Sequence, residues 1–274
     1  MNNNSNDASD PKLYWENRLN ENFGLHGTGF IGLGRQYNNW MYKLRRKIFL
    51  RIMGSMDIDF SKAEVLDVGS GTGFYISRWK ELGVKKINGT DITNIAVRNL
   101  KQKYVGEIFY ELDITDDNDV ATKLDDKKYD IISAIDVLYH VIDDKRYQKA
   151  IENIHGLLRP DGIFLISENF LHNGVVRGEN QVSRSLSDIE KKLHMTGFDI
   201  IRRTPVFILM NYPIDSDSNL RKLLWRAAMF LVNRNEAIGF LLGACLYPID
   251  LMLTSISKES PTTEFMVCRK TKPS

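Results

Sequence analysis

Three glycines at alternate positions stand between a short apolar run, residues 65–68, and an apolar helical pattern that opens at residue 74. A strand, a glycine turn and a helix start in one run expose amide N–H groups, which can bind ribose or carboxylate oxygens of a ligand. Glycine has no Cβ, so a bound molecule can meet bare backbone. The polar and glycine residues of this predicted ligand-binding turn are Asp67, Gly69, Ser70, Gly71 and Gly73.

A carboxylate ends the next apolar stretch, residues 87–92, where Asp91 follows Gly69 by 22 positions. At the tip of a neighbouring strand, it can accept hydrogen bonds from both hydroxyls of a ribose. This geometry alone does not choose between NAD and another nucleoside cofactor. The spacing Gly-x-Gly-x-Gly differs, however, from the Gly-x-Gly-x-x-Gly that admits a pyrophosphate. Residues 27–32 do match that second spacing, but no strand precedes them, so we expect a flexible cofactor-covering segment there.

The run around the three glycines resembles the first motif of the class I S-adenosylmethionine-dependent methyltransferases, and the resemblance extends over residues 63–170. It implies S-adenosyl-L-methionine as cofactor, with the ribose at the end of the second strand and the adenine near the ends of the third and fourth. For the acid after the third strand, a helix N-cap is the alternative. The cofactor-binding candidates beyond the glycine turn are Asp91, Ile92, Asp113, Ile114, Ile135, Asp136 and Tyr37.

Two side chains after the fourth predicted strand, residues 129–136, are the catalytic candidates. Parallel doubly wound sheets bind ligands at the carboxyl ends of their strands, which places Tyr139 and His140 on the acceptor side. His140 is a candidate general base, since its unperturbed pKa is near neutrality. The alternative is a histidine that orders the helix start or stacks on the cofactor.

The elements that position these residues alternate along the chain as strand and helix, which predicts a doubly wound, mostly parallel seven-stranded α/β sheet. The 274 residues, 43% hydrophobic, suit one large domain with an appended piece. We divide it into a disordered tail (1–10), an N-terminal helical cap (11–56), a core (57–210 and 262–274) and a helical insertion (211–261). Within the cap, residues 37–53 form a basic amphipathic helix, either packed on the sheet with a solvated face or facing an anionic substrate group or membrane.

The insertion separates two strands, 198–210 and 263–269, which we expect to form an antiparallel hairpin at the sheet edge. Its helical stretches, 220–232 and 237–256, are too apolar for a solvent-exposed insertion. A spanning helix is not expected, because the charge-free run is only 13 residues long and contains Pro248. We predict the lid of an acceptor pocket, with a peripheral membrane contact, a dimer interface and a core extension as alternatives.

Net charge of +2 gives no basic field for nucleic acid, and two cysteines without metal spacing predict no metal site and a reducing, cytoplasmic location. The expected activity is methyl transfer to a small-molecule acceptor, with O-methylation favoured and N- or C-methylation open. A lipophilic or a sugar-containing acceptor suits the composition. The alternatives are an NAD(P)-linked oxidoreductase and a cofactor-binding module or peripheral membrane protein without activity. The oligomeric state is open.

Overall fold

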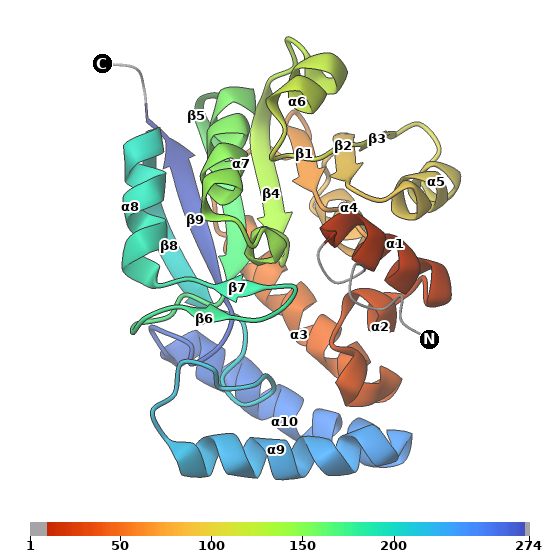
Figure 1. The fold of residues 1–274 in the computed structure, drawn as a ribbon, viewed down its shortest axis with the longest axis vertical. Helices are drawn as coiled ribbons and strands as arrows, with labels where there is room; N and C mark the ends of the chain where they lie inside the picture. Colours follow the sequence, from red (N-terminus) through yellow and green to blue (C-terminus); the bar gives the residue numbers. More distant parts are fainter. Residues whose placement is uncertain (1–9, 272–274) are drawn as a thin grey trace.

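A seven-stranded sheet forms the centre of the molecule in the computed structural model, which describes residues 10–271 (Figure 1). Its strand order is β3-β2-β1-β4-β5-β9-β8, and all neighbours are parallel except that β9 is antiparallel to β5 and β8. The predicted doubly wound sheet with an antiparallel edge hairpin is confirmed. The strands are β1 (Glu64–Val68), β2 (Lys86–Asp91), β3 (Ile108–Glu111), β4 (Tyr129–Ile135), β5 (Leu158–Glu168), β8 (Phe198–Pro205) and β9 (Glu264–Lys270).

Helices cover both faces of the sheet, because the strands are apolar on both sides. One buried cluster joins the sheet to α3 (Gly34–Gly54), α4 (Phe74–Glu81) and α5 (Asn94–Lys103). The other joins it to α6 (Asp117–Leu124), α7 (Asp144–Leu157) and α8 (Leu186–Thr196). A two-stranded hairpin, β6 (Val176–Arg177) and β7 (Val182–Ser183), follows the end of β5.

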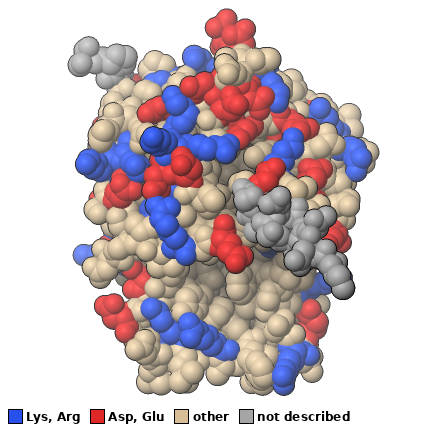
Figure 2. Space-filling view, viewed as in Figure 1, with Lys and Arg blue, Asp and Glu red and all other residues tan. Residues whose placement is uncertain are grey.

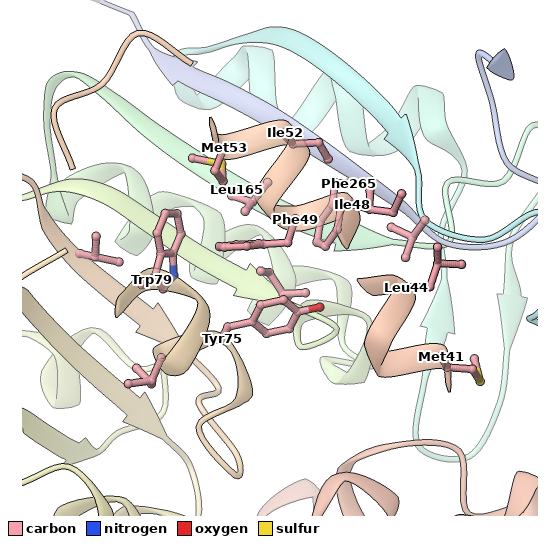
Figure 3. Packing of buried hydrophobic residues seen from close by; sticks show 14 of the residues in the cluster. Met41, Leu44, Ile48, Phe49, Ile52, Met53, Tyr75, Trp79, Leu165 and Phe265 are labelled. Atoms are coloured by element: carbon pink, nitrogen blue, oxygen red, sulfur yellow. The ribbon is translucent and has the colours of Figure 1, made fainter. Parts of the chain in front are cut away.

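Helix α3 is a core helix of the domain, with one apolar stripe buried against the sheet (Figure 3). Phe49 packs edge-on against Trp79 of α4, with ring centroids 4.9 Å apart, and also contacts Phe265 of β9. The indole Nε1 of Trp79 donates to the Ser133 hydroxyl at 3.1 Å, so this buried donor is satisfied. The basic amphipathic helix predicted here therefore packs on the sheet.

The N-terminal segment consists of α1 (Pro11–Glu21), α2 (Leu25–Thr28) and the 3-10 turn η2 (Ile31–Leu33). Asp10 caps α1 by accepting a hydrogen bond from the Lys12 amide at 2.9 Å, so the predicted disordered tail does not include it; residues 1–9 lie outside the described part. Glu16 of α1 accepts hydrogen bonds from the amides of Asn94 and Ile95 at the start of α5, and so connects these two helices.

Two helices, α9 (Asn219–Arg234) and α10 (Glu236–Ile256), lie between β8 and β9 at one end of the molecule (Figure 1). The strand predicted for residues 198–210 is too long, since β8 ends at Pro205. The buried Asp250 carboxylate of α10 accepts from the amides of residues 208–210 at 2.7–3.2 Å, so these residues cannot continue the ladder.

The two ends of this helical segment meet. The Asp215 amide donates to the Pro261 carbonyl at 3.1 Å. The His172 ring lies between two carboxylates, pairing through Nδ1 with Asp215 and through Nε2 with Glu259 at 2.9 Å. Asp215 and Glu259 stand on opposite sides of the helices in the chain, so one histidine ties the entry of the segment to its exit.

Candidate functional site

A cavity of about 370 Å³ lies at the carboxyl ends of β1, β2 and β4 and beside the loop after β3. This is the place that the topology of a doubly wound sheet favours for a ligand. Among described residues, its lining includes most of the predicted site, and these residues are Gly69, Ser70, Gly71, Asp91, Ile92, Asp113, Ile114, Ile135, Asp136 and His140.

The N-terminal helices close the cavity on the side away from the strands. Pro11, Trp15 and Leu19 of α1, Thr28 of α2 and Tyr42 of α3 line it. The hydroxyls of Thr28 and Tyr42 are 3.1 Å apart, which connects α2 to α3 over the cavity. The segment with the Gly-x-Gly-x-x-Gly spacing thus covers the cavity and forms no dinucleotide turn. None of residues 211–261 lines the cavity, so the predicted acceptor lid does not touch it.

The glycine turn has positive φ angles, which residues with a side chain rarely adopt. Gly69 has φ = 67°, and a Cβ there would lie 2.3 Å from a methyl group of Val137. Gly73 has φ = 77° and begins α4, and a Cβ there would be 2.7 Å from Leu100 and Tyr104. Gly73 does not line the cavity, so its role in the structure is to allow the turn rather than to meet a ligand.

Asp91 is buried at the end of β2, and its carboxylate already accepts three hydrogen bonds. Oδ1 accepts from the amide and hydroxyl of Thr93 at 3.0 and 2.7 Å, and Oδ2 accepts from the Gly71 amide at 2.8 Å. Burial raises its pKa. Since a carboxylate offers about four acceptor positions, one remains, on Oδ2. Asp91 can therefore accept from one ribose hydroxyl, not from both as the sequence analysis expected.

Asp113 follows β3 and lies in a small polar network at the cavity wall. Its Oδ1 accepts from the amide and hydroxyl of Thr115 at 2.9 and 2.7 Å, and its Oδ2 pairs with Arg146 of α7 at 2.5 Å. The N-cap of α6 is Asp116, which rules out the alternative that Asp113 caps this helix. Arg146 also lines the cavity and was missed from the sequence.

Asp136 follows β4 with φ = 58° and pairs with the largely buried Arg45 of α3. Its Oδ1 accepts from the Ser167 hydroxyl at 2.8 Å, and that hydroxyl accepts from the Asp136 amide at 2.9 Å. The sequence analysis did not single out Arg45 among the basic residues of the helix 37–53. Arg45 lies four residues after Met41, and this spacing on the buried stripe is the signal that could have identified it.

His140 lies on the 3-10 turn η3 (Leu138–His140) and its ring lines the cavity. Its Nδ1 is 2.7 Å from the Asn180 carbonyl; because a carbonyl only accepts, Nδ1 carries the proton and Nε2 is free to accept one. Burial lowers its pKa to about 4, so the ring is neutral at pH 7 and is a weaker base than a free histidine. Trp15 contacts it edge-on at 4.9 Å.

Three other predicted residues do not reach the cavity. Asp67 is buried beside Ser133 of the neighbouring strand β4 and accepts from its hydroxyl at 2.6 Å. Burial raises the pKa of Asp67 to about 7. Tyr37 is fully buried and donates to the Met210 carbonyl at 3.0 Å, so it connects α3 to the loop after β8. Tyr139 packs against the His140 ring, 4.3 Å between centroids, and supports that histidine from outside the cavity lining.

Sequence reasoning missed Tyr75 as a lining residue. Its hydroxyl is buried near the Arg45 guanidinium, and burial raises its pKa. No hydrogen bond of good geometry satisfies this hydroxyl among the described residues, so a ligand group in the cavity can bind it. The described residues hold no cluster of three or more His, Cys, Asp or Glu able to bind a metal ion.

Comparison with known proteins agrees with this geometry. The family described as methyltransferase domain matches residues 66–166, the stretch that supplies the glycine turn and the ends of β2, β3 and β4. A ribosomal protein L11 methyltransferase of Staphylococcus haemolyticus is 29% identical over 141 residues, which is 51% of this chain and 39% of that protein. The chain thus spans about two fifths of the length of the curated relatives it matches.

Two solved structures share the fold over nearly the whole chain. Magnesium protoporphyrin IX methyltransferase from Synechocystis PCC 6803, with bound S-adenosylmethionine, has 16% identity and a TM-score of 0.56, with 97% of this chain and 100% of that chain covered. The N-methyltransferase NodS from Bradyrhizobium japonicum WM9, in complex with S-adenosyl-L-homocysteine, has 12% identity and a TM-score of 0.57, with 96% and 99% covered.

Proposed function

We propose that this chain, which carries a class I S-adenosylmethionine-dependent methyltransferase domain, transfers the methyl group of that cofactor to a small-molecule acceptor. The observation that supports this best is the cavity itself. The family-matched glycine turn and the acids after β2, β3 and β4 line one wall, while α1, α2 and α3 close the other. A covered cavity of about 370 Å³ suits small reactants.

The residues present fit the cofactor. The free acceptor position on Asp91 suits a ribose hydroxyl, and the apolar side chains of Leu112 and Ile114 offer a surface for the adenine ring. The buried Tyr75 hydroxyl is a further polar partner for a bound group. We assign Asp113 to the adenine amino group, with Arg146 holding its carboxylate in place.

When bound, S-adenosylmethionine supplies an electrophilic methyl group. The protein's part is to exclude water with the covering helices and to hold the two reactants in line, and such orientation can lower a barrier by roughly 7–11 kcal/mol. Proton removal from the acceptor falls to His140, whose Nε2 is free to accept a hydrogen bond or a proton. Its lowered pKa suits an acceptor that needs only a hydrogen-bond partner as the methyl group arrives.

We favour O-methylation of a lipophilic or sugar-containing acceptor, with N- or C-methylation as the other outcomes. The helices α9 and α10 would influence the acceptor only through α3, since they do not line the cavity. The second candidate is a protein acceptor, which the similarity to ribosomal protein L11 methyltransferases favours. We place the protein in the cytoplasm, where the free thiols of Cys245 and Cys268 would stay reduced.

Incubation with tritiated S-adenosylmethionine and a cell extract tests the proposal. We expect label in the solvent-extractable small-molecule fraction, and less of it by about tenfold or more with an Asp91→Asn variant at a cofactor concentration below the dissociation constant of the parent. Label confined to the acid-precipitated protein fraction would favour the protein acceptor. Calorimetry showing tight NAD(H) binding and no heat with S-adenosylmethionine would instead favour the oxidoreductase alternative.

A further inference from the structure

The outward sides of α9 and α10 are apolar, although they face away from the rest of the protein. Leucines and a phenylalanine recur on α9 at spacings of three and four residues, and branched and sulfur-containing residues do so on α10, so each set lies on one side of its helix. Their exposed fractions run from 37% to 70%. We call this set the outer apolar face, and it consists of Leu220, Leu223, Leu224, Phe230, Leu231, Ile238, Leu241, Ile249, Met252 and Ile256.

The inner sides of the same helices are fixed to the domain. Met229 and Val232 of α9 are buried, and Gly243 of α10 lies so close to Trp40 that a Cβ would be 2.4 Å from its ring. Asp250 is held by the amides after β8. The two helices thus carry apolar residues on both their inner and their outer sides, and the domain covers only the inner ones.

The charges on α9 are all positive. Helix α9 contains four basic residues, Arg221, Lys222, Arg226 and Arg234, and no acid. The two acids of α10 are both bound by backbone amides, since Glu236 accepts from Arg35 and Gln36 at 2.8 Å and Asp250 is fully buried. The end of the molecule at which α9 and α10 lie is mostly tan, with blue patches on it and red patches at its two sides (Figures 1 and 2).

We propose that the outer apolar face is a docking surface for an anionic lipid bilayer, on which the α9–α10 pair lies flat. Apolar helices flanked by Lys and Arg insert into the boundary between headgroups and acyl chains, and each cation near an anionic surface strengthens binding about fivefold. A second copy of this chain fits less well where a two-fold contact sets α9 against α9, because the four cations of each helix would meet and α9 itself carries no acid to pair them.

The pair lies on the bilayer rather than spanning it. Helix α10 is long and apolar enough to cross a membrane by length and composition, and only 22% of its most apolar window is buried. Spanning would require Gly243 to leave Trp40 and Asp250 to lose its amide partners, leaving a buried carboxylate unpaired. Flat docking keeps these contacts and covers only the outward residues.

Vesicle co-sedimentation of the full chain tests this inference, with phosphatidylcholine vesicles that do or do not contain phosphatidylglycerol. We expect pelleting with the anionic vesicles at low salt, and weaker binding to pure phosphatidylcholine and at high salt. Leu224→Glu with Leu231→Glu should weaken binding by about tenfold or more. The matched control is Val105→Glu with Met195→Glu, which places the same charges at exposed apolar positions outside α9 and α10 and should bind as the parent does.

Several results would overturn the inference. The first is absence of pelleting by the parent chain, and equal loss of binding in the control variant would count in the same way. The second is a dimer in light scattering that Leu224→Glu with Leu231→Glu dissociates while vesicles are not bound, which would assign the face to a second copy. The third is retention in the membrane fraction after alkaline carbonate extraction, which would indicate a spanning helix. None of these results bears on cofactor binding, so the inference and the proposed function can fail separately.

Discussion

Replacing Asp91 by Asn tests the cofactor site most directly, because the two side chains have the same shape. In the structure the Asp91 carboxylate supports the glycine turn through the Gly71 amide and anchors the start of α5 through Thr93. One acceptor position, on Oδ2, is left for a ligand at the cavity wall. If the amide NH₂ of Asn takes the place of Oδ2, that position can no longer accept a hydrogen bond.

The expected loss of cofactor affinity follows from this count. A hydrogen bond to a charged acceptor contributes about 1.5–3 kcal/mol, so losing one should weaken S-adenosylmethionine binding about 12- to 150-fold. Had both ribose hydroxyls bonded to Asp91, the loss would be about the square of this range. Folding stability should fall too, by about 1–3 kcal/mol, because the amide NH₂ at the place of Oδ2 faces the Gly71 amide, which then loses its acceptor.

Isothermal titration calorimetry with S-adenosylmethionine and S-adenosylhomocysteine measures the effect. Thr93→Val is the control, because it removes the hydroxyl that donates to Oδ1 at 2.7 Å but leaves the carboxylate. We expect it to cost about 1 kcal/mol of stability and to change affinity by less than about threefold. A folded Asp91→Asn protein, verified by its thermal unfolding, that binds cofactor within about twofold of the parent would refute the assignment of the ribose contact to Asp91.

Three further outcomes are expected. If His140 removes a proton, His140→Ala should lower turnover by roughly 10²–10⁴ and leave cofactor affinity unchanged. Because the pKa of His140 is about 4, its titration should not change the rate between pH 6 and 8. A decrease in turnover of less than about threefold excludes the general-base role. Arg45→Met leaves the Asp136 carboxylate unpaired in a largely buried site, so the free energy of unfolding, measured by urea titration, should fall by about 3–5 kcal/mol. Adding Asp136→Asn should recover most of this loss, and a single variant within about 1 kcal/mol of the parent would contradict the reasoning. Burial raises the pKa of Glu168 to about 8, so the folded state holds a proton that the unfolded state releases above about pH 4.5. The free energy of unfolding should therefore fall as the pH rises from about 4.5 to about 8. Glu168→Gln, which still accepts from Tyr147, should remove this pH dependence in urea titrations at several pH values.

The sequence predicted the sheet and the ligand-facing ends of its strands, because those features depend on local pattern. The glycines mark the positions of positive φ in the turn after β1. Asp91 ends the apolar run of β2, which is parallel to β1, so it lies at the same edge of the sheet as this turn. The edge hairpin was found for the same reason. The end of β8 was not, since it depends on Asp250, which binds the amides after the strand and lies 40 residues beyond Met210 in the chain.

Side-chain roles that depend on packing could not be read in the same way. Asp67 and Tyr37 have types that suit a cofactor site, but Asp67 faces Ser133 across the sheet and Tyr37 faces the loop after β8. Arg45 was hidden by its charge, because a cation next to an apolar stripe is usually solvated. Its partner Asp136 comes from a distant strand end, and only the fold brings the two together.

The meeting of the two ends of the α9–α10 segment bears on how this segment can be altered. Since the Asp215 amide reaches the Pro261 carbonyl, the segment leaves the edge hairpin and returns to it at nearly one point. A segment attached in this manner can change in length at its tip without separating the two strands. The His172 clamp across Asp215 and Glu259 marks its two ends, and a protein engineer who moved the helix pair to another enzyme of this fold would also have to move the surface of α3 on which it packs.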